Sequence, residues 1–235
     1  MRCVATSLFS RAYEKLTASY PYDSLGNKAN PLDELLYIVL SLRTHESGFR
    51  AAYSGFKRAF PAWAMACKAS RRQIAGAIAA GGLAKQKAFR IKAALDMIQA
   101  QFGEPSLRRL KRAPVEEVER ILLALPGIGA KSARCIMMYS LGFKVLPVDV
   151  HVARVSQRLG LVPRVTHSKL HGLLERIVPP DFRYAFHVYC VQHGRRVCRG
   201  QYPQCGRCCL ADICPHIGVV PPEDTGRSSP VLHCP

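Results

Sequence analysis

Apolar residues recur at intervals of three and four positions along most of this chain, as they do on the buried face of an α-helix. After Asn30-Pro31, a pair that favours a helix start, this spacing is kept by Leu32, Leu35, Leu36 and Val39. The same pattern predicts further helices over residues 49–60, 70–80, 85–102, 115–125, 130–141, 149–159, 170–177 and 182–193. We find no convincing strand pattern, and the sequence therefore predicts an all-α fold.

Polar and conformationally special residues mark the expected ends of these helices. Ser70 and Gln73 have the spacing of a capping box, in which each side chain bonds to the main chain of the other residue. Gly81-Gly82 is expected to end that helix, and Gly103 the next one. On the helix over 85–102, four basic side chains are expected to be exposed, namely Lys85, Lys87, Arg90 and Lys92.

The charge of the chain suits a polyanionic partner. The 235 residues are 49% hydrophobic, which is enough for a folded core, and they carry a formal net charge of +18. No apolar run approaches the ~20 residues of a bilayer span, and residues 1–15 lack a secretory stretch. Those residues fit either a basic helix or an organelle transit peptide. In a bacterium we expect a cytoplasmic, nucleoid-associated protein.

Residues 125–133, Leu-Pro-Gly-Ile-Gly-Ala-Lys-Ser-Ala, join two of the predicted helices. Gly127 and Gly129 can adopt positive φ and carry no side chain, so this hairpin can present main-chain N–H groups to one DNA phosphate. For an isolated Pro-Gly-x-Gly, a plain connection between helices is an equally good interpretation.

Lys131 falls in the first turn of the helix after this hairpin, where the helix dipole repels a cation. That repulsion, the nearby Arg134 and any burial are expected to lower the pKa of Lys131 and free an amine for attack. Asp149 opens the helix over 149–159, where a carboxylate caps the main chain. The same carboxylate can face Lys131 across a cleft.

Five of the ten cysteines lie within one short segment. Four of them, Cys198, Cys205, Cys208 and Cys214, have the spacing C-x6-C-x2-C-x5-C, and Cys209 is left over. Without an export signal the compartment is expected to be reducing, which favours metal binding over a disulfide. Four thiolates suit either a tetrahedral zinc ion or a [4Fe-4S] cluster.

The segments LPGIGAKSA and VDVHVARV, together with the cysteine spacing, resemble the endonuclease III family of helix-hairpin-helix DNA glycosylases and AP lyases, over residues 30–214. The resemblance implies that Lys131 is the nucleophile, that Asp149 is the catalytic acidic group and that the cysteines hold a [4Fe-4S] cluster. The cluster would stiffen a loop whose basic side chains meet the DNA backbone, with the candidates Arg195, Arg196, Arg199 and Arg207.

Further DNA contacts follow from the same resemblance. Leu83 matches the leucine that fills the gap left by the extruded nucleotide, although a core leucine is an equally good interpretation. Arg43 stands where the family has a glutamine, and His151 matches a histidine beside the aspartate. The hairpin would contribute Leu125, Gly127 and Gly129.

The resemblance also implies two helical domains that flank a DNA-binding cleft. Residues 31–143 would form a helical barrel-like domain, residues 1–30 and 144–214 the cluster domain, and residues 215–235 a flexible tail. The expected function is that of a monomeric base-excision glycosylase with AP lyase activity on double-stranded DNA, acting on oxidised pyrimidines. Two alternatives stay open, a glycosylase for a mismatched or alkylated base and a DNA-binding protein without catalysis.

Overall fold

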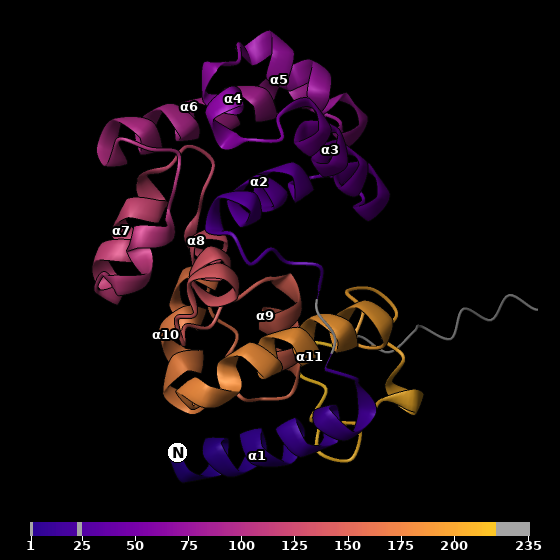
Figure 1. The fold of residues 1–235 in the computed structure, drawn as a ribbon. Coiled ribbons are helices and arrows are strands. Elements are labelled where there is room, and N and C mark those ends of the chain that lie inside the picture. Colours follow the sequence, from indigo (N-terminus) through magenta and orange to yellow (C-terminus); the bar gives the residue numbers. More distant parts are fainter. Residues whose placement is uncertain (1, 23–24, 220–235) are drawn as a thin grey trace, which may run out of the picture.

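The computed structural model describes residues 2–22 and 25–219, and within these ranges the ordered elements are all helical (Figure 1). The α-helices are α1 (Arg2–Ser19), α2 (Pro31–Ser41), α3 (Glu46–Ala59), α4 (Trp63–Lys68), α5 (Arg71–Ala77), α6 (Ala84–Phe102), α7 (Val115–Ala124), α8 (Ala130–Ile136), α9 (Val150–Arg158), α10 (His167–Ile177) and α11 (Arg183–Arg196). The all-α prediction is confirmed. No helix in these ranges is both long enough and apolar enough to cross a membrane.

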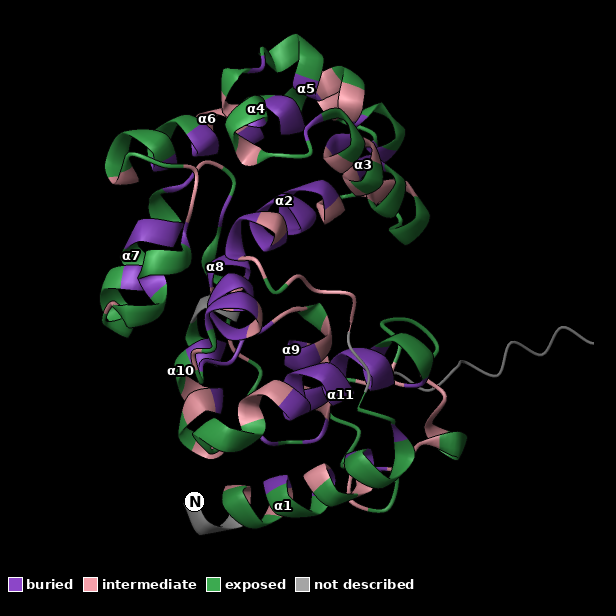
Figure 2. Ribbon diagram, in the orientation of Figure 1, coloured by how far each residue is buried: buried purple, intermediate pink, exposed green. Residues whose placement is uncertain are grey.

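The buried side chains form two hydrophobic cores. The first core gathers residues of α2 to α8 and the segment that follows, from Leu32 to Val145. The second core joins α1 to α9, α10 and α11, and includes Leu210 beside the cysteine segment. Figure 1 shows α1 running alongside α11, far from it in sequence, and Figure 2 shows the buried positions concentrated on α2 and α11. The domain boundaries inferred above stay a prediction.

The predicted helix starts are present in detail. The Asn30 side chain accepts a hydrogen bond from the Leu32 N–H at 2.9 Å, and Ser70 and Gln73 form both bonds of a capping box. Gly103 ends α6 with φ 76°. The expected end of the preceding helix is wrong, because α5 stops at Ala77 and Gly81 lies in a 3-10 turn, η1 (Ala79–Gly81).

Another expectation fails. Lys87 is not exposed but 2% accessible, because its ammonium group finds three oxygen acceptors inside the protein. The flexible tail over residues 215–235 stays a prediction; in its described part, the Ile217 N–H donates to the Arg158 carbonyl at 3.1 Å. The rest of the expected tail, residues 220–235, lies outside the described residues.

Arg134 connects elements of both cores. From α8, its guanidinium donates to Glu119 of α7 at 2.9 Å and to Glu175 of α10 at 2.5 Å. Glu175 also accepts the Leu146 N–H at 2.9 Å, at the point where the chain passes into the second core. These side chains are 15–25% exposed, so the ion pairs are partly shielded from water.

We expect Glu175→Ala to lower the free energy of unfolding by about 1–3 kcal/mol, because it leaves the Arg134 charge and the Leu146 N–H without their acceptor. Asp181→Ala is the matched control, since its pair with Lys144 is exposed and worth less than about 1 kcal/mol. Urea unfolding measures both variants. Equal losses would contradict the role given to Glu175.

Candidate active site

Lys131 and Asp149 line the same open pocket, which has a volume of about 410 Å³. The pocket lies where α2, α3, α8 and α11 meet the start of α9. Its walls include Tyr37, Phe49, Cys135, Tyr139, His187 and Arg195. Its size lies in the lower half of the roughly 300–1,000 Å³ that small-molecule sites occupy.

Asp149 is held by the helix that it starts. Its Oδ1 accepts the N–H groups of His151 and Val152, each at 2.9 Å, as predicted for an N-cap. Burial alone would raise the pKa of Asp149, but His187, the Val152 N–H and Lys131 outweigh it and lower the pKa. The group is therefore an ionised carboxylate at neutral pH.

The expected pKa shift of Lys131 is wrong in direction. Burial lowers the pKa of this amine, but Cys135, Asp149 and Glu34 outweigh burial and raise it above the ordinary value. Cys135 lies one turn further along α8 and is buried, and burial raises its own pKa to about 11. Lys131 is thus an ammonium group in the free protein, and it must lose a proton before it can attack.

Glu34, in the first turn of α2, is a buried acid that the sequence analysis did not single out. It is 0% exposed and accepts the Lys28 N–H at 2.6 Å and the Asn27 side-chain amide at 2.5 Å. Burial raises its pKa, although Lys28, Asn27 and Lys131 act against this. Its position between Leu32 and Leu35 in an apolar stripe was the signal available in the sequence.

The hairpin glycines differ from each other. Gly127 has φ 85°, and a Cβ there would lie 2.8 Å from the Arg90 side chain. Gly129 does not take a positive φ: at −99° it is the extended N-cap of α8, and no atom lies within 4 Å of the place of a Cβ. The main chain at Gly129 is therefore open to an approaching group. The Leu125 side chain is 3% exposed and packs in the first core.

The resemblance matches Leu83, Arg43 and His151 to DNA-contacting positions, and these residues lie at the surface or near it. Leu83 is 51% exposed, so it is not a core leucine, and both Leu83 and Arg43 have φ 52°. Arg43 is exposed and lies two residues after Ser41, which lines the pocket. His151 is partly buried beside Gly194 and accepts a hydrogen bond from Arg154 at 3.0 Å.

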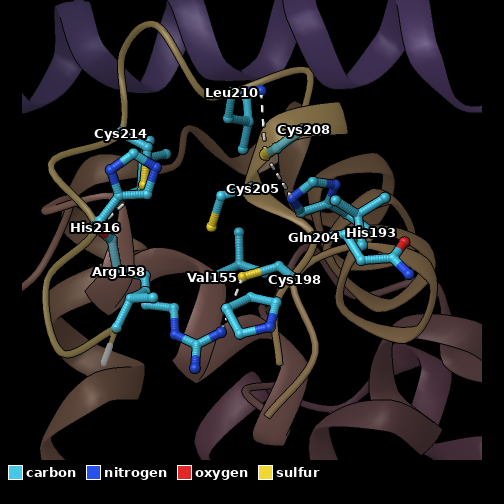
Figure 3. A pocket seen from close by; sticks show the side chains of 14 residues that line it. Val155, Arg158, His193, Cys198, Gln204, Cys205, Cys208, Leu210, Cys214 and His216 are labelled. Atoms are coloured by element: carbon cyan, nitrogen blue, oxygen red, sulfur yellow. Dashed lines mark hydrogen bonds between the residues drawn. The ribbon is translucent and has the colours of Figure 1, made fainter. Parts of the chain in front are cut away.

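One cavity is lined by the four cysteines of the C-x6-C-x2-C-x5-C pattern, and Figure 3 shows their side chains arranged around it. All four are free thiols. In the described part of the chain, no three potential ligands come close enough to share one metal ion, as a zinc site requires. Four thiols around one cavity match the donor set of a [4Fe-4S] cluster.

Hydrogen-bond donors surround these sulfurs. The Leu210 N–H donates to the Cys208 Sγ at 3.4 Å, and the Arg158 guanidinium to the Cys198 Sγ at 3.5 Å. His193 contacts the Cys208 Sγ at 3.6 Å, and burial lowers its pKa to about 4, so its ring is neutral. Burial raises the pKa of the Cys208 thiol to about 11, and the Leu210 N–H acts against burial because it stabilises the thiolate. The four basic side chains expected near this segment, Arg195, Arg196, Arg199 and Arg207, are all exposed.

Comparisons with known proteins show which family model and which relatives this chain resembles. Residues 37–180 match the family model of the HhH-GPD superfamily base excision DNA repair protein. The chain is 34% identical over 165 residues to an Arabidopsis thaliana protein that is provisionally named a DNA glycosylase. The match covers 70% of this chain and 56% of the relative, so this chain spans just over half of the relative's length. It is 27% identical over 210 residues to endonuclease III of Synechocystis, covering 88% and 89% of the two chains.

A solved structure of endonuclease III in a non-covalent complex with DNA has the same fold. The TM-score is 0.77 at 22% sequence identity, and the similarity covers 90% of this chain and 95% of the other.

The raised pKa of Lys131 leads to a measurable expectation. Asp149→Asn and Glu34→Gln each remove a negative charge that raises this pKa, so each should move the Lys131 titration to lower pH. The pH dependence of reductive methylation at Lys131, followed by peptide mass spectrometry, measures it. Asp33→Asn is the control, because Asp33 pairs with Lys57 instead. A profile that stays in place or moves to higher pH would contradict this electrostatic account.

Proposed function

Because this chain belongs to the HhH-GPD superfamily of base excision DNA repair proteins, we propose that it is a DNA glycosylase with AP lyase activity, in which Lys131 and Asp149 act on one extruded nucleotide. The observation that carries this proposal is that both side chains line a single pocket. A DNA-binding protein without catalysis would not need an amine and a carboxylate at the same place.

Binding begins with the phosphate backbone. The net charge of +18 favours a polyanion, and the open main chain at Gly129 gives one phosphate a place to bind without regard to base sequence. Leu125 would act through its neighbours, since its side chain is buried. The exposed Leu83 and Arg43 would fill the space that the extruded nucleotide leaves.

Chemistry requires an uncharged amine. Lys131 first gives a proton to Asp149, the ionised carboxylate in the same pocket. The amine nitrogen then bonds to the sugar C1′ while the bond from C1′ to the base breaks, and the base leaves with that electron pair and takes up a proton. As this bond breaks, Asp149 gives the proton to the departing base, and its carboxylate, negative again, stabilises the positive charge that develops on the sugar.

Strand cleavage follows from the new bond. The sugar ring opens and a protonated Schiff base forms between Lys131 and C1′. This cation acidifies the hydrogen at C2′, and loss of that proton expels the 3′ phosphate by β-elimination. Hydrolysis of the imine then frees Lys131. The raised pKa of Lys131 makes the first proton transfer the demanding one.

Cys198, Cys205, Cys208 and Cys214 would hold a [4Fe-4S] cluster, which when bound cross-links this segment into a rigid loop. The loop joins the C-terminal end of α11 to α9, because Arg158 donates to the carbonyls of Arg199 at 2.6 Å and Gly200 at 2.9 Å. The exposed arginines of this region would then meet DNA as a fixed surface.

The substrate class that we propose is DNA with an oxidised pyrimidine. A mismatched or alkylated base is the second candidate, favoured by Arg43, a long cation where the resemblance leads one to expect a glutamine. A panel of duplexes carrying single lesions separates the two. Release of an alkylated or mismatched base at a higher kcat/KM than an oxidised pyrimidine would overturn the first assignment.

Borohydride trapping on abasic duplex DNA tests the chemistry. We expect the wild type to form a covalent adduct and Lys131→Gln to form none, with a loss of more than about 100-fold in lyase rate. Lys68→Gln, at an exposed lysine on α4, is the matched control and should trap normally. Trapping that persists in Lys131→Gln at the wild-type level would sink the assignment of the nucleophile.

Substitution at the cysteines tests the cluster. The wild type should contain about four iron atoms and four acid-labile sulfides per chain, and Cys208→Ser should lose most of both. Its neighbour Cys209 is not among the cavity-lining residues, so Cys209→Ser should keep the iron. One tightly bound zinc in place of iron, in protein purified without oxygen, would contradict the cluster.

A further inference from the structure

Lys87 is a lysine inside the protein with no acidic partner. It lies on α6 and is 2% exposed, and it takes part in none of the ion pairs of the described residues. Burial lowers its pKa, and no nearby charge acts on it. A buried cation is costly unless its donors are satisfied, so the position of its three acceptors defines what it does.

The three acceptors come from three separate segments. Lys87 Nζ donates to the Leu40 carbonyl at 2.6 Å, to the Thr44 Oγ1 at 2.5 Å and to the Gly81 carbonyl at 3.0 Å. Leu40 is in the last turn of α2, where carbonyls lack a helical partner and a cation is favoured. Gly81 ends the 3-10 turn η1. One ammonium group thus satisfies carbonyls at the ends of two helical elements.

Thr44 closes a ring of hydrogen bonds. Its hydroxyl accepts from Lys87 and donates to the Gly81 carbonyl at 2.8 Å, so the loop after α2 and the loop after η1 are bonded to each other as well as to the lysine. The main chains on this side are also in close contact, since a Cβ at Gly55 of α3 would lie 2.4 Å from the Ala77 carbonyl oxygen. The two loops therefore form one rigid unit.

Each loop carries a strained residue with an exposed side chain. Arg43, next to Thr44, and Leu83, two residues after Gly81, both have φ 52°. A non-glycine residue in the left-handed region costs about 1 kcal/mol or more and persists where the surrounding structure enforces it. The bonds to Lys87 and Thr44 supply that enforcement. Thr44 also lines the pocket that holds Lys131 and Asp149, so the unit lies at its rim.

We propose that Lys87 is a positioning residue that locks the two loops together, so that Arg43 and Leu83 enter duplex DNA as one rigid unit when a nucleotide is extruded. This inference rests on the proposed function and goes beyond it, because Lys87 touches neither the DNA nor the reacting atoms. This one role explains why Lys87 is buried, why Arg43 and Leu83 are held in the left-handed region, and why the Thr44 hydroxyl bonds to both Lys87 and Gly81.

The role predicts a dependence on the second DNA strand. In a duplex the extruded nucleotide leaves a gap that must be filled, whereas a single strand has no gap. Lys87→Met keeps the length and removes the bonds, so its AP lyase rate should fall by about tenfold or more on duplex abasic DNA and by less than about twofold on single-stranded abasic DNA. Lys92→Met is the matched control on the same helix, because Lys92 donates to the Cys67 carbonyl and to Asp96 instead.

Coupling provides a second readout. If Lys87 acts through the two exposed side chains, Lys87→Met should add less than about twofold to the loss on duplex DNA already caused by the double variant Arg43→Ala/Leu83→Ala. Hydrogen exchange of residues 41–45 and 79–83 should also speed up in Lys87→Met but not in Lys92→Met. Thr44→Val, which keeps the cation and removes the shared hydroxyl, should show the same duplex-specific loss, and it serves if Lys87→Met does not fold.

The outcomes separate this inference from the function beneath it. Equal losses on duplex and single-stranded DNA, additive effects with the double variant, or unchanged exchange of both loops would each overturn the role of Lys87 while the wild-type enzyme remains active. A wild type that cleaves neither abasic substrate would overturn the proposed function and this role with it.

Discussion

A partly buried ammonium group among acidic neighbours organises the centre of this molecule. Lys131 on α8 is surrounded by Asp149 at the start of α9, Glu34 on α2 and the Cys135 thiol. Charges taken out of water must be balanced locally, and this requirement brings three helices from two cores to one point. Each group stabilises the charged form of the other, so Asp149 raises the pKa of Lys131 and Lys131 lowers the pKa of Asp149. The free protein thus stabilises the pair in its charged form.

Stability and reactivity oppose each other at this pair. An enzyme that needs a neutral amine would gain from a lowered pKa, yet the carboxylates that position Lys131 also keep its proton in place. In the reaction that we propose, this conflict is resolved because the acceptor, Asp149, lines the same pocket as Lys131. The proton transfer then becomes part of the reaction and does not have to precede binding.

Much of the fold could be read from local sequence signals. The apolar spacing, the Asn30 and Ser70 caps and the Gly103 stop act within a few residues, and all of them appear in the structure. The expectations that failed concern groups whose environment is made by distant segments. Lys87 is bonded to residues 40, 44 and 81, and the pKa of Lys131 depends on Glu34, almost a hundred positions away. No local pattern contains those contacts.

The chain passes between the two cores at two places, through residues 25–30 and again through residues 143–149. The first crossing is anchored on the first core, since Lys28 is bonded through its N–H to Glu34 and through its carbonyl to Ser140, at 2.6 Å each. Two bodies joined by a pair of links resist twisting and sliding, and bend most easily about the line through both links. The Arg134–Glu175 ion pair adds a third connection, so a change in the angle between the two cores would have to break or rearrange that ion pair as well.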